Sequence, residues 1–220
     1  MRAGHLVPVL TVCVLITPAT RALAQHDTTP PQTTVSAAAA ALVSFQPADD
    51  TYVGLPYLNK GLGGIGPAIG AALTLRHRAF VATVEFSVAS IEVEQSGRLA
   101  DDRSTGRLRD SLLSLLAGTD VPAGAFRARI LGGISRAGAS PSSDGVPIDE
   151  PPGGAPLGER TSRWAPTVGI DLTRALKGRV GLLGTLRFAH IDRSEAARQR
   201  GVGSYVLRGG IGLTVRLVRP

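Results

Sequence analysis

Several common structural devices are missing from this chain. Its one cysteine, Cys13, lies close to the N-terminus, so no disulfide framework can hold the fold together. No stretch after residue 24 has eighteen apolar residues without a charge, which excludes a transmembrane helix there. Aromatic residues make up 4% of the chain and do not alternate with a basic stripe, so we expect no nucleic-acid partner.

The N-terminus has the features of a secretory signal peptide. Arg2 precedes an apolar run over 6–16, and Ala22-Leu23-Ala24 forms a small-residue cleavage site before Gln25. We therefore predict a signal peptide over 1–24, which contains Cys13. Its removal leaves 22 Lys and Arg against 17 Asp and Glu, a net charge of +5, because Arg2 and Arg21 are lost with no acid. The polar segment 25–34, "QHDTTPPQTT", is expected to be a flexible lead-in.

The rest of the chain alternates between apolar and polar residues with a period of two, which is typical of β-strands. Two further segments are ambiguous. An alanine run in 39–45 could start a helix, and the leucines of 108–118 fit a helix almost as well as a strand; we predict strands for both. The six clear segments are 65–75, 80–88, 126–135, 164–173, 180–188 and 205–217.

The connections between these eight segments alternate strictly between long and short. This alternation predicts an up-and-down antiparallel barrel over 35–220, with both chain ends on the side of the short turns. Pro67 and Pro166 lack an N–H for pairing and are expected at a barrel rim or a bulge. The long connections are 47–62, 92–107, 138–163 and 190–203, and the short ones are 76–78, 119–125 and 175–178.

The two faces of the strands differ sharply in polarity. One face is nearly pure Leu, Ile, Val and Phe, and the other carries Gly, Ala, Ser and charged residues. Strands of about 9–11 residues suit a membrane-spanning barrel, in which the charged face lines a narrow lumen. We expect a salt-bridge network that plugs this lumen, formed by Glu85, Asp171, Arg127, Arg129, Arg187, Arg208 and Arg216. The opposite orientation would give a soluble periplasmic, lipocalin-like barrel that binds an apolar ligand inside.

In pattern, the sequence resembles the small eight-stranded outer-membrane barrels of the OmpA/OmpX transmembrane type. The resemblance rests on "GPAIGAALTLRHRAFVATVEF", "RWAPTVGIDLTRALKGRVGLLGTLRFAH" and the terminal "LRGGIGLTVRL". It implies an all-β transmembrane barrel in a bacterial outer membrane, with a structural or adhesive role and four extracellular loops. It also implies contact with outer-membrane lipid and lipopolysaccharide, insertion by the barrel assembly machinery, a monomeric state, and no cofactor or metal.

One stretch offers a candidate for catalysis. In "RFAHIDRSE", His190 is followed by Asp192 and Ser194, the residue types of a nucleophilic site. The stretch is faintly similar to outer-membrane lipid A deacylases, whose motif places a serine where this chain has Asp192. Ser194 would therefore have to serve as the nucleophile. We keep a lipid hydrolase as an alternative and expect a rim histidine without a catalytic role.

Overall fold

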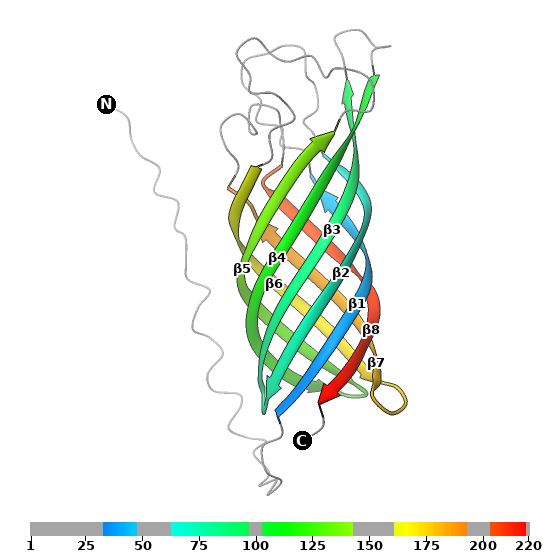
Figure 1. Ribbon diagram of the computed structural model, residues 1–220, viewed down its shortest axis with the longest axis vertical. Coiled ribbons are helices and arrows are strands. Elements are labelled where there is room, and N and C mark those ends of the chain that lie inside the picture. The colour runs from blue at the N-terminus through cyan, green and yellow to red at the C-terminus, as the bar shows by residue number, and fades with distance from the viewer. Residues whose placement is uncertain (1–32, 48–62, 97–102, 143–160, 193–202, 219–220) are drawn as a thin grey trace, which may run out of the picture. The chain divides into compact units, whose positions relative to one another are not determined.

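The computed structural model of this chain describes residues 33–47, 63–96, 103–142, 161–192 and 203–218. The described residues form eight strands that close into one antiparallel up-and-down barrel, in the order β1 to β8 with β8 paired to β1 (Figure 1). The predicted fold class is thus confirmed. The strands are β1 (Thr33–Gln46), β2 (Gly64–His77), β3 (Phe80–Ser96), β4 (Arg103–Ala123), β5 (Phe126–Ser142), β6 (Thr161–Ala175), β7 (Val180–His190) and β8 (Tyr205–Val218).

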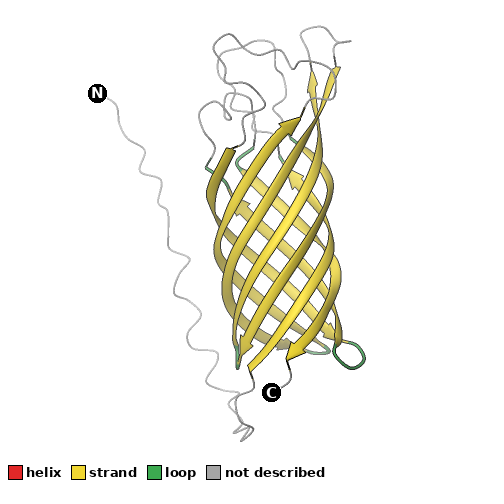
Figure 2. Cartoon of the chain, in the orientation of Figure 1, coloured by secondary structure: helices red, strands yellow, loops and turns green. Residues whose placement is uncertain are grey.

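Both ambiguous segments are strands. Residues 39–45 lie within β1 and residues 108–118 within β4, and the helical alternatives are wrong because each strand pairs with a neighbour on both sides. Figure 2 shows only strands and loops in the described part of the chain. The described residues include no helical segment that could span a lipid bilayer. β1 begins at Thr33, two residues before the expected start of the barrel, and the predicted signal peptide lies outside the described residues.

The short turns gather at one end of the barrel, where β1 begins and β8 ends (Figure 1). Gly124 and Gly178 adopt φ values of 62° and 67° in two of these turns, a conformation that glycine tolerates without strain. The turns are tighter than the sequence suggested, since pairing continues to His77↔Phe80 and Ala123↔Phe126. The expected boundaries at 76–78 and 119–125 are therefore wrong.

The strands also extend further toward the opposite end than alternation indicated. The expected connection 92–107 shrinks because β3 and β4 remain paired as far as Ser96↔Arg103. The connection 138–163 shrinks in the same way, since β5 ends at Ser142 and β6 begins at Thr161. Polar residues in these stretches are typical of loops, but backbone pairing does not require apolar side chains.

Pro67 and Pro166, the two prolines expected at a rim or a bulge, sit where one side of a strand stops pairing. Pro67 pairs in register with Val43 of β1, but pairing of β2 with β3 begins only at Ala68. Pro166 is opposite Ile134 of β5, and pairing of β6 with β7 begins at Thr167. Each proline therefore occupies the rim position that its missing N–H requires.

The apolar faces point outward. β7 illustrates the alternation, because Leu186, Phe188 and His190 are exposed while Arg187 and Ala189 between them are buried. The most exposed large apolar residues include Ile211, Ile69 and Trp164, at 76%, 70% and 65%. This orientation is the reverse of what a soluble barrel with an apolar interior needs.

The barrel interior also contains apolar clusters that the sequence analysis did not anticipate. Their members share a strand face with polar residues, which hid them in the alternation pattern. One cluster consists of Leu42, Ala68, Ala89, Ile91 and Leu108, a second of Leu112, Ala137, Ala165, Ala189, Ile191 and Val206, and a third of Val81, Leu116 and Leu131.

Candidate functional site

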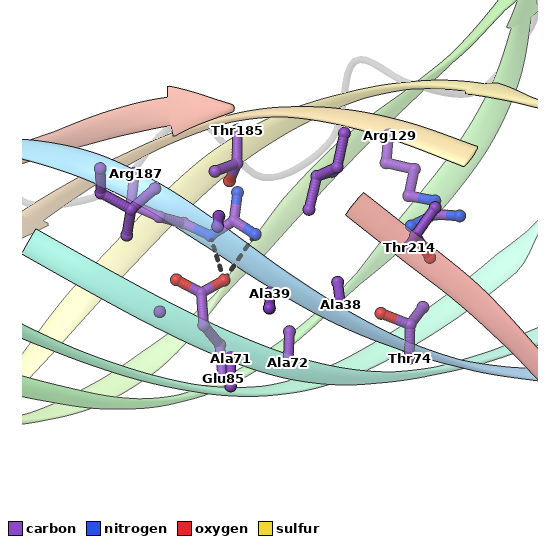
Figure 3. A pocket seen from close by; sticks show the side chains of 14 residues that line it. Ala38, Ala39, Ala71, Ala72, Thr74, Glu85, Arg129, Thr185, Arg187 and Thr214 are labelled. Carbon is purple, nitrogen blue, oxygen red and sulfur yellow. Dashed lines mark hydrogen bonds and ion pairs between the residues drawn. The ribbon is translucent and has the colours of Figure 1, made fainter. Parts of the chain in front are cut away.

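The first charged group in the lumen centres on Arg187 of β7. Its guanidinium donates to Glu85 Oε2 of β3 from Nε at 2.9 Å and from Nη2 at 2.7 Å, and Nη1 donates to Asp171 Oδ1 of β6 at 2.7 Å. All three side chains are less than a tenth exposed. Figure 3 shows Arg187 and Glu85 reaching toward each other across the interior. Such short charged hydrogen bonds compensate the cost of burying the three charges.

A second charged group joins four strands. Arg208 of β8 donates to Asp110 Oδ2 of β4 at 3.0 Å and to Ser87 Oγ of β3 at 2.6 Å. Its Nε also donates to Ser44 Oγ of β1 at 3.3 Å. The Arg208 and Asp110 side chains are 1% and 2% exposed, so this pair is fully withdrawn from solvent.

A third group lies near the turn end and is built on Asp120 of β4. Its carboxylate, which is fully buried, forms ion pairs with Arg76 Nε at 2.9 Å, Arg127 Nη1 at 3.5 Å and Arg129 Nε at 3.8 Å. The Asp120 backbone N–H donates to the Ala79 carbonyl at 2.8 Å, which fixes the strand beside the β2–β3 turn. One carboxylate thus serves three arginines, and positive charge is in excess here.

Hydroxyl groups fill much of the remaining polar interior. Ser135 of β5 bonds to Ser114 of β4 at 2.7 Å and to Thr167 of β6 at 2.6 Å, and Thr74 bonds to Thr83 at 3.1 Å. The cavity beside Arg187 and Glu85, drawn in Figure 3, holds only about 20 Å³. A single water needs about 10–15 Å³, so this space admits one or two waters.

The structure divides the seven predicted lumen residues among these groups. Glu85, Asp171 and Arg187 meet one another, whereas Arg208 pairs elsewhere. Arg127 and Arg129 lie at the turn end, as does Arg216, which faces the lumen there. Three charged residues that form ion pairs in these groups were not among the predicted lumen residues. Asp110 sits in the segment that also fitted a helix, and Asp120 and Arg76 sit in segments assigned to turns, so none had been given a strand face.

The catalytic candidates do not form a cluster in the described residues. His190 projects from the outer surface of β7, where its ring lies 4.8 Å from the ring of Tyr205. Phe188 stacks on the same Tyr205 at 5.3 Å, so His190 extends an aromatic patch. Asp192 is exposed, and Ser194 lies outside the described residues. No group of three or more His, Cys, Asp or Glu that could hold a metal occurs in the part of the chain that the structure describes.

Comparison with known proteins finds similarity in structure alone. No family model matches the sequence, and no curated protein matches it. Among solved structures, Neisserial surface protein A aligns with a TM-score of 0.56 at 12% identity, over 83% of this chain and 97% of that one. The outer membrane protein OprG from Pseudomonas aeruginosa aligns with a TM-score of 0.58 at 10% identity, over 86% of this chain and 98% of that one. The two alignments show a common barrel fold.

Proposed function

We propose that this chain, which has the fold of the small eight-stranded outer-membrane β-barrels, is a non-enzymatic protein of a bacterial outer membrane. In this role it is a structural or adhesive platform. The barrel crosses the lipid and carries the four connections that follow β1, β3, β5 and β7 on the outside of the cell.

The outward apolar surface carries this proposal. Large apolar side chains on every strand are exposed on the barrel exterior, from Val43 on β1 to Leu217 on β8. A soluble monomer rarely exposes a continuous apolar surface of this extent. A closed barrel satisfies its backbone hydrogen bonds internally, as hydrocarbon requires. The aromatic patch of Phe188, His190 and Tyr205 lies at the loop end, where interfacial girdles occur in such barrels.

A plugged lumen is the second part of the proposal. It is supported by the three charged groups, the hydroxyl contacts and the apolar clusters, which fill the interior with side chains. Eight strands leave an interior just wide enough for such filling. We therefore propose a barrel that does not conduct ions across the membrane.

The partners follow from the same surface. We propose that the apolar belt contacts outer-membrane lipid and that the net positive charge favours lipopolysaccharide phosphates. A chain of this type is inserted by the barrel assembly machinery. Because the closed sheet offers no free edge for pairing with another copy, we propose a monomer.

Gel mobility of the detergent-extracted membrane fraction tests the proposed location. A closed barrel should run differently before and after boiling, because it resists unfolding in the denaturing detergent until it is heated. Replacing residues 145–158 by a short Gly-Ser linker should leave this shift unchanged if the barrel is an independent platform. Recovery of the protein in the soluble fraction without a shift would overturn the proposal.

Cysteine labelling tests which end faces outward. The chain without residues 1–24 has no cysteine, so a single one can be introduced at either end. In intact cells, a membrane-impermeant maleimide should label Asp192→Cys, beyond β7, and spare Lys177→Cys, in the β6–β7 turn. Both should react after the outer membrane is permeabilised. Labelling of Lys177→Cys alone in intact cells would contradict the proposed orientation.

A further inference from the structure

A cavity of about 270 Å³ lies inside the turn end of the barrel. Its wall includes Thr34 and Ser36 of β1 and Thr214 of β8, and its mouth lies beside Gly124 and Gly178 in two of the turns. The cavity is more than ten times larger than the space beside Arg187. It can therefore hold a polyatomic ion together with water.

The cavity is strongly basic. Arg76, Arg127, Arg129 and Arg216 line it from lumen-facing strand positions, and Arg179 adds a fifth guanidinium from the β6–β7 turn. The acid paired with this set is Asp120, so five positive charges stand against one negative charge, a local excess of +4. Arg174 also lies in the wall, but its guanidinium sits 5.5 Å from the Phe126 ring centre.

The single carboxylate of Asp120 does not balance the positive charge of these five arginines. Arg76 is repelled by Arg127, Arg129 and Arg216 and attracted by Asp120. Arg129 Nε and both carboxylate oxygens of Asp120 are buried and make no hydrogen bond in the described structure. Among the described residues, the side chains of Arg179 and Arg216 also have no ion-pair partner. Arg179 and Arg216 are exposed to solvent. An anion that enters the cavity can therefore reach two guanidinium groups that have no acidic partner among the described residues.

We infer that this cavity is a binding site for a multivalent oxyanion of the phosphate class. The planar guanidinium presents paired N–H donors that match two oxygens of a phosphate. Arg216 and Arg179 are neighbours at the mouth, because the Arg216 backbone N–H donates to the Arg179 carbonyl at 2.9 Å, and both line the cavity. The Thr and Ser hydroxyls of the wall add donors. The same chemistry serves a free phosphate compound and the phosphate headgroup of a lipid in the adjacent leaflet.

Pyrophosphate is the probe for the first test. The folded protein in a zwitterionic detergent is heated with increasing pyrophosphate, and the folded fraction is read from unboiled gel mobility. Ligand that binds only the folded state raises the unfolding midpoint in a saturable manner. We expect this rise for the wild type. Sodium chloride at matched ionic strength should not reproduce it, since chloride only screens charge.

Two single variants and a matched control locate the effect. Arg216→Gln and Arg179→Gln each remove one unpaired guanidinium and leave the Asp120 ion pairs in place, so both should fold. Each should weaken the apparent pyrophosphate affinity about tenfold or more, the effect of one lost charged hydrogen bond. Lys177→Gln removes the same charge from the same turn at a residue outside the cavity wall and should leave the affinity unchanged.

Two outcomes would overturn the site. One is a wild-type unfolding midpoint that pyrophosphate does not raise, or raises without saturation. The other is a loss of pyrophosphate affinity in Lys177→Gln equal to that in the arginine variants. A vesicle experiment then identifies the source of the phosphate. If a lipid headgroup is the ligand, phosphatidylglycerol in phosphatidylcholine vesicles stabilises the wild type more than Arg216→Gln, and pyrophosphate adds nothing further. If a free anion is the ligand, pyrophosphate stabilises the wild type equally in vesicles of phosphatidylcholine alone and in vesicles that also contain phosphatidylglycerol. Either result supports oxyanion binding. The vesicle experiment rests on the proposed membrane-spanning barrel, whereas the pyrophosphate titration in detergent does not.

Discussion

Gly169 of β6 lies directly opposite Arg187 of β7, and the space that a Cβ atom at Gly169 would need is occupied by the Arg187 side chain. An added Cβ would stand 2.7 Å from Nη1 and 2.8 Å from Cδ of Arg187. The absence of a side chain at one position therefore allows the arginine to turn inward and reach both Glu85 and Asp171.

The first prediction concerns this contact. Gly169→Ala should displace the Arg187 guanidinium and lower the free energy of unfolding by about 1–3 kcal/mol, the usual cost of overpacking. Urea titration of the protein in lipid vesicles measures the change. Gly184→Ala on β7 is the matched control, because its Cβ would meet no atom closer than 3.9 Å. An equal loss of unfolding free energy in Gly169→Ala and Gly184→Ala would mean that the cost does not come from the contact with Arg187.

The second prediction tests the buried charges around Arg187. Arg187→Met should lower the free energy of unfolding by about 3–5 kcal/mol, because it leaves Glu85 and Asp171 buried without their cation. The triple variant Arg187→Met/Glu85→Gln/Asp171→Asn removes those charges and should recover most of the loss. The same urea titration compares the three proteins. A triple variant as unstable as the single one would show that packing, and not charge, sets the cost.

The third prediction tests whether the outer surface faces lipid. Ile211→Arg places a charge on the most exposed apolar position of β8 and should cost about 2–4 kcal/mol if that position lies near the bilayer midplane. Leu217→Arg, near the end of the same strand, should cost only about 0–1 kcal/mol. Unfolding in lipid vesicles gives both values. Equal, small costs at the two positions would indicate that the strand does not cross a bilayer.

The fourth prediction separates the platform from a lipid hydrolase. The mass spectrum of lipid A should be the same before and after incubation with the purified wild-type protein, because His190 packs on Tyr205 at the outer surface. His190→Ala and Ser194→Ala should behave as the wild type does. Release of fatty acid by the wild type that is lost in His190→Ala would establish the enzymatic alternative.

Period-two alternation predicted the strands, because a closed sheet buries every second residue, and the order of long and short connections predicted the barrel. The alternation also placed Glu85, Asp171 and Arg187 on polar faces. It could not show that they meet, because β3 and β7 are not neighbours in the sheet and contact each other only across the lumen. That contact depends on the curvature and register of the whole barrel.

The missed charges have a local explanation. Asp110 shares its strand face with Leu108 and Leu112, so an apolar pattern concealed a buried acid. Asp120 and Arg76 lie near prolines, glycines or turn residues, which indicated loops, yet backbone pairing extends past them to the turn itself. The basic cavity combines residues from such strand ends, and for that reason no single segment of the sequence revealed it.

The pairing of β1 with β8 also constrains how the molecule can form. Ala40 and Gly212 are paired although 172 residues separate them in the chain. Backbones approach so closely along this seam that a Cβ at Gly212 would lie 2.1 Å from the Ala39 carbonyl oxygen. β8 must find β1 before the barrel can close, and contacts of such long range form slowly. We therefore expect the small residues of this seam to affect the rate of folding as well as the stability of the barrel.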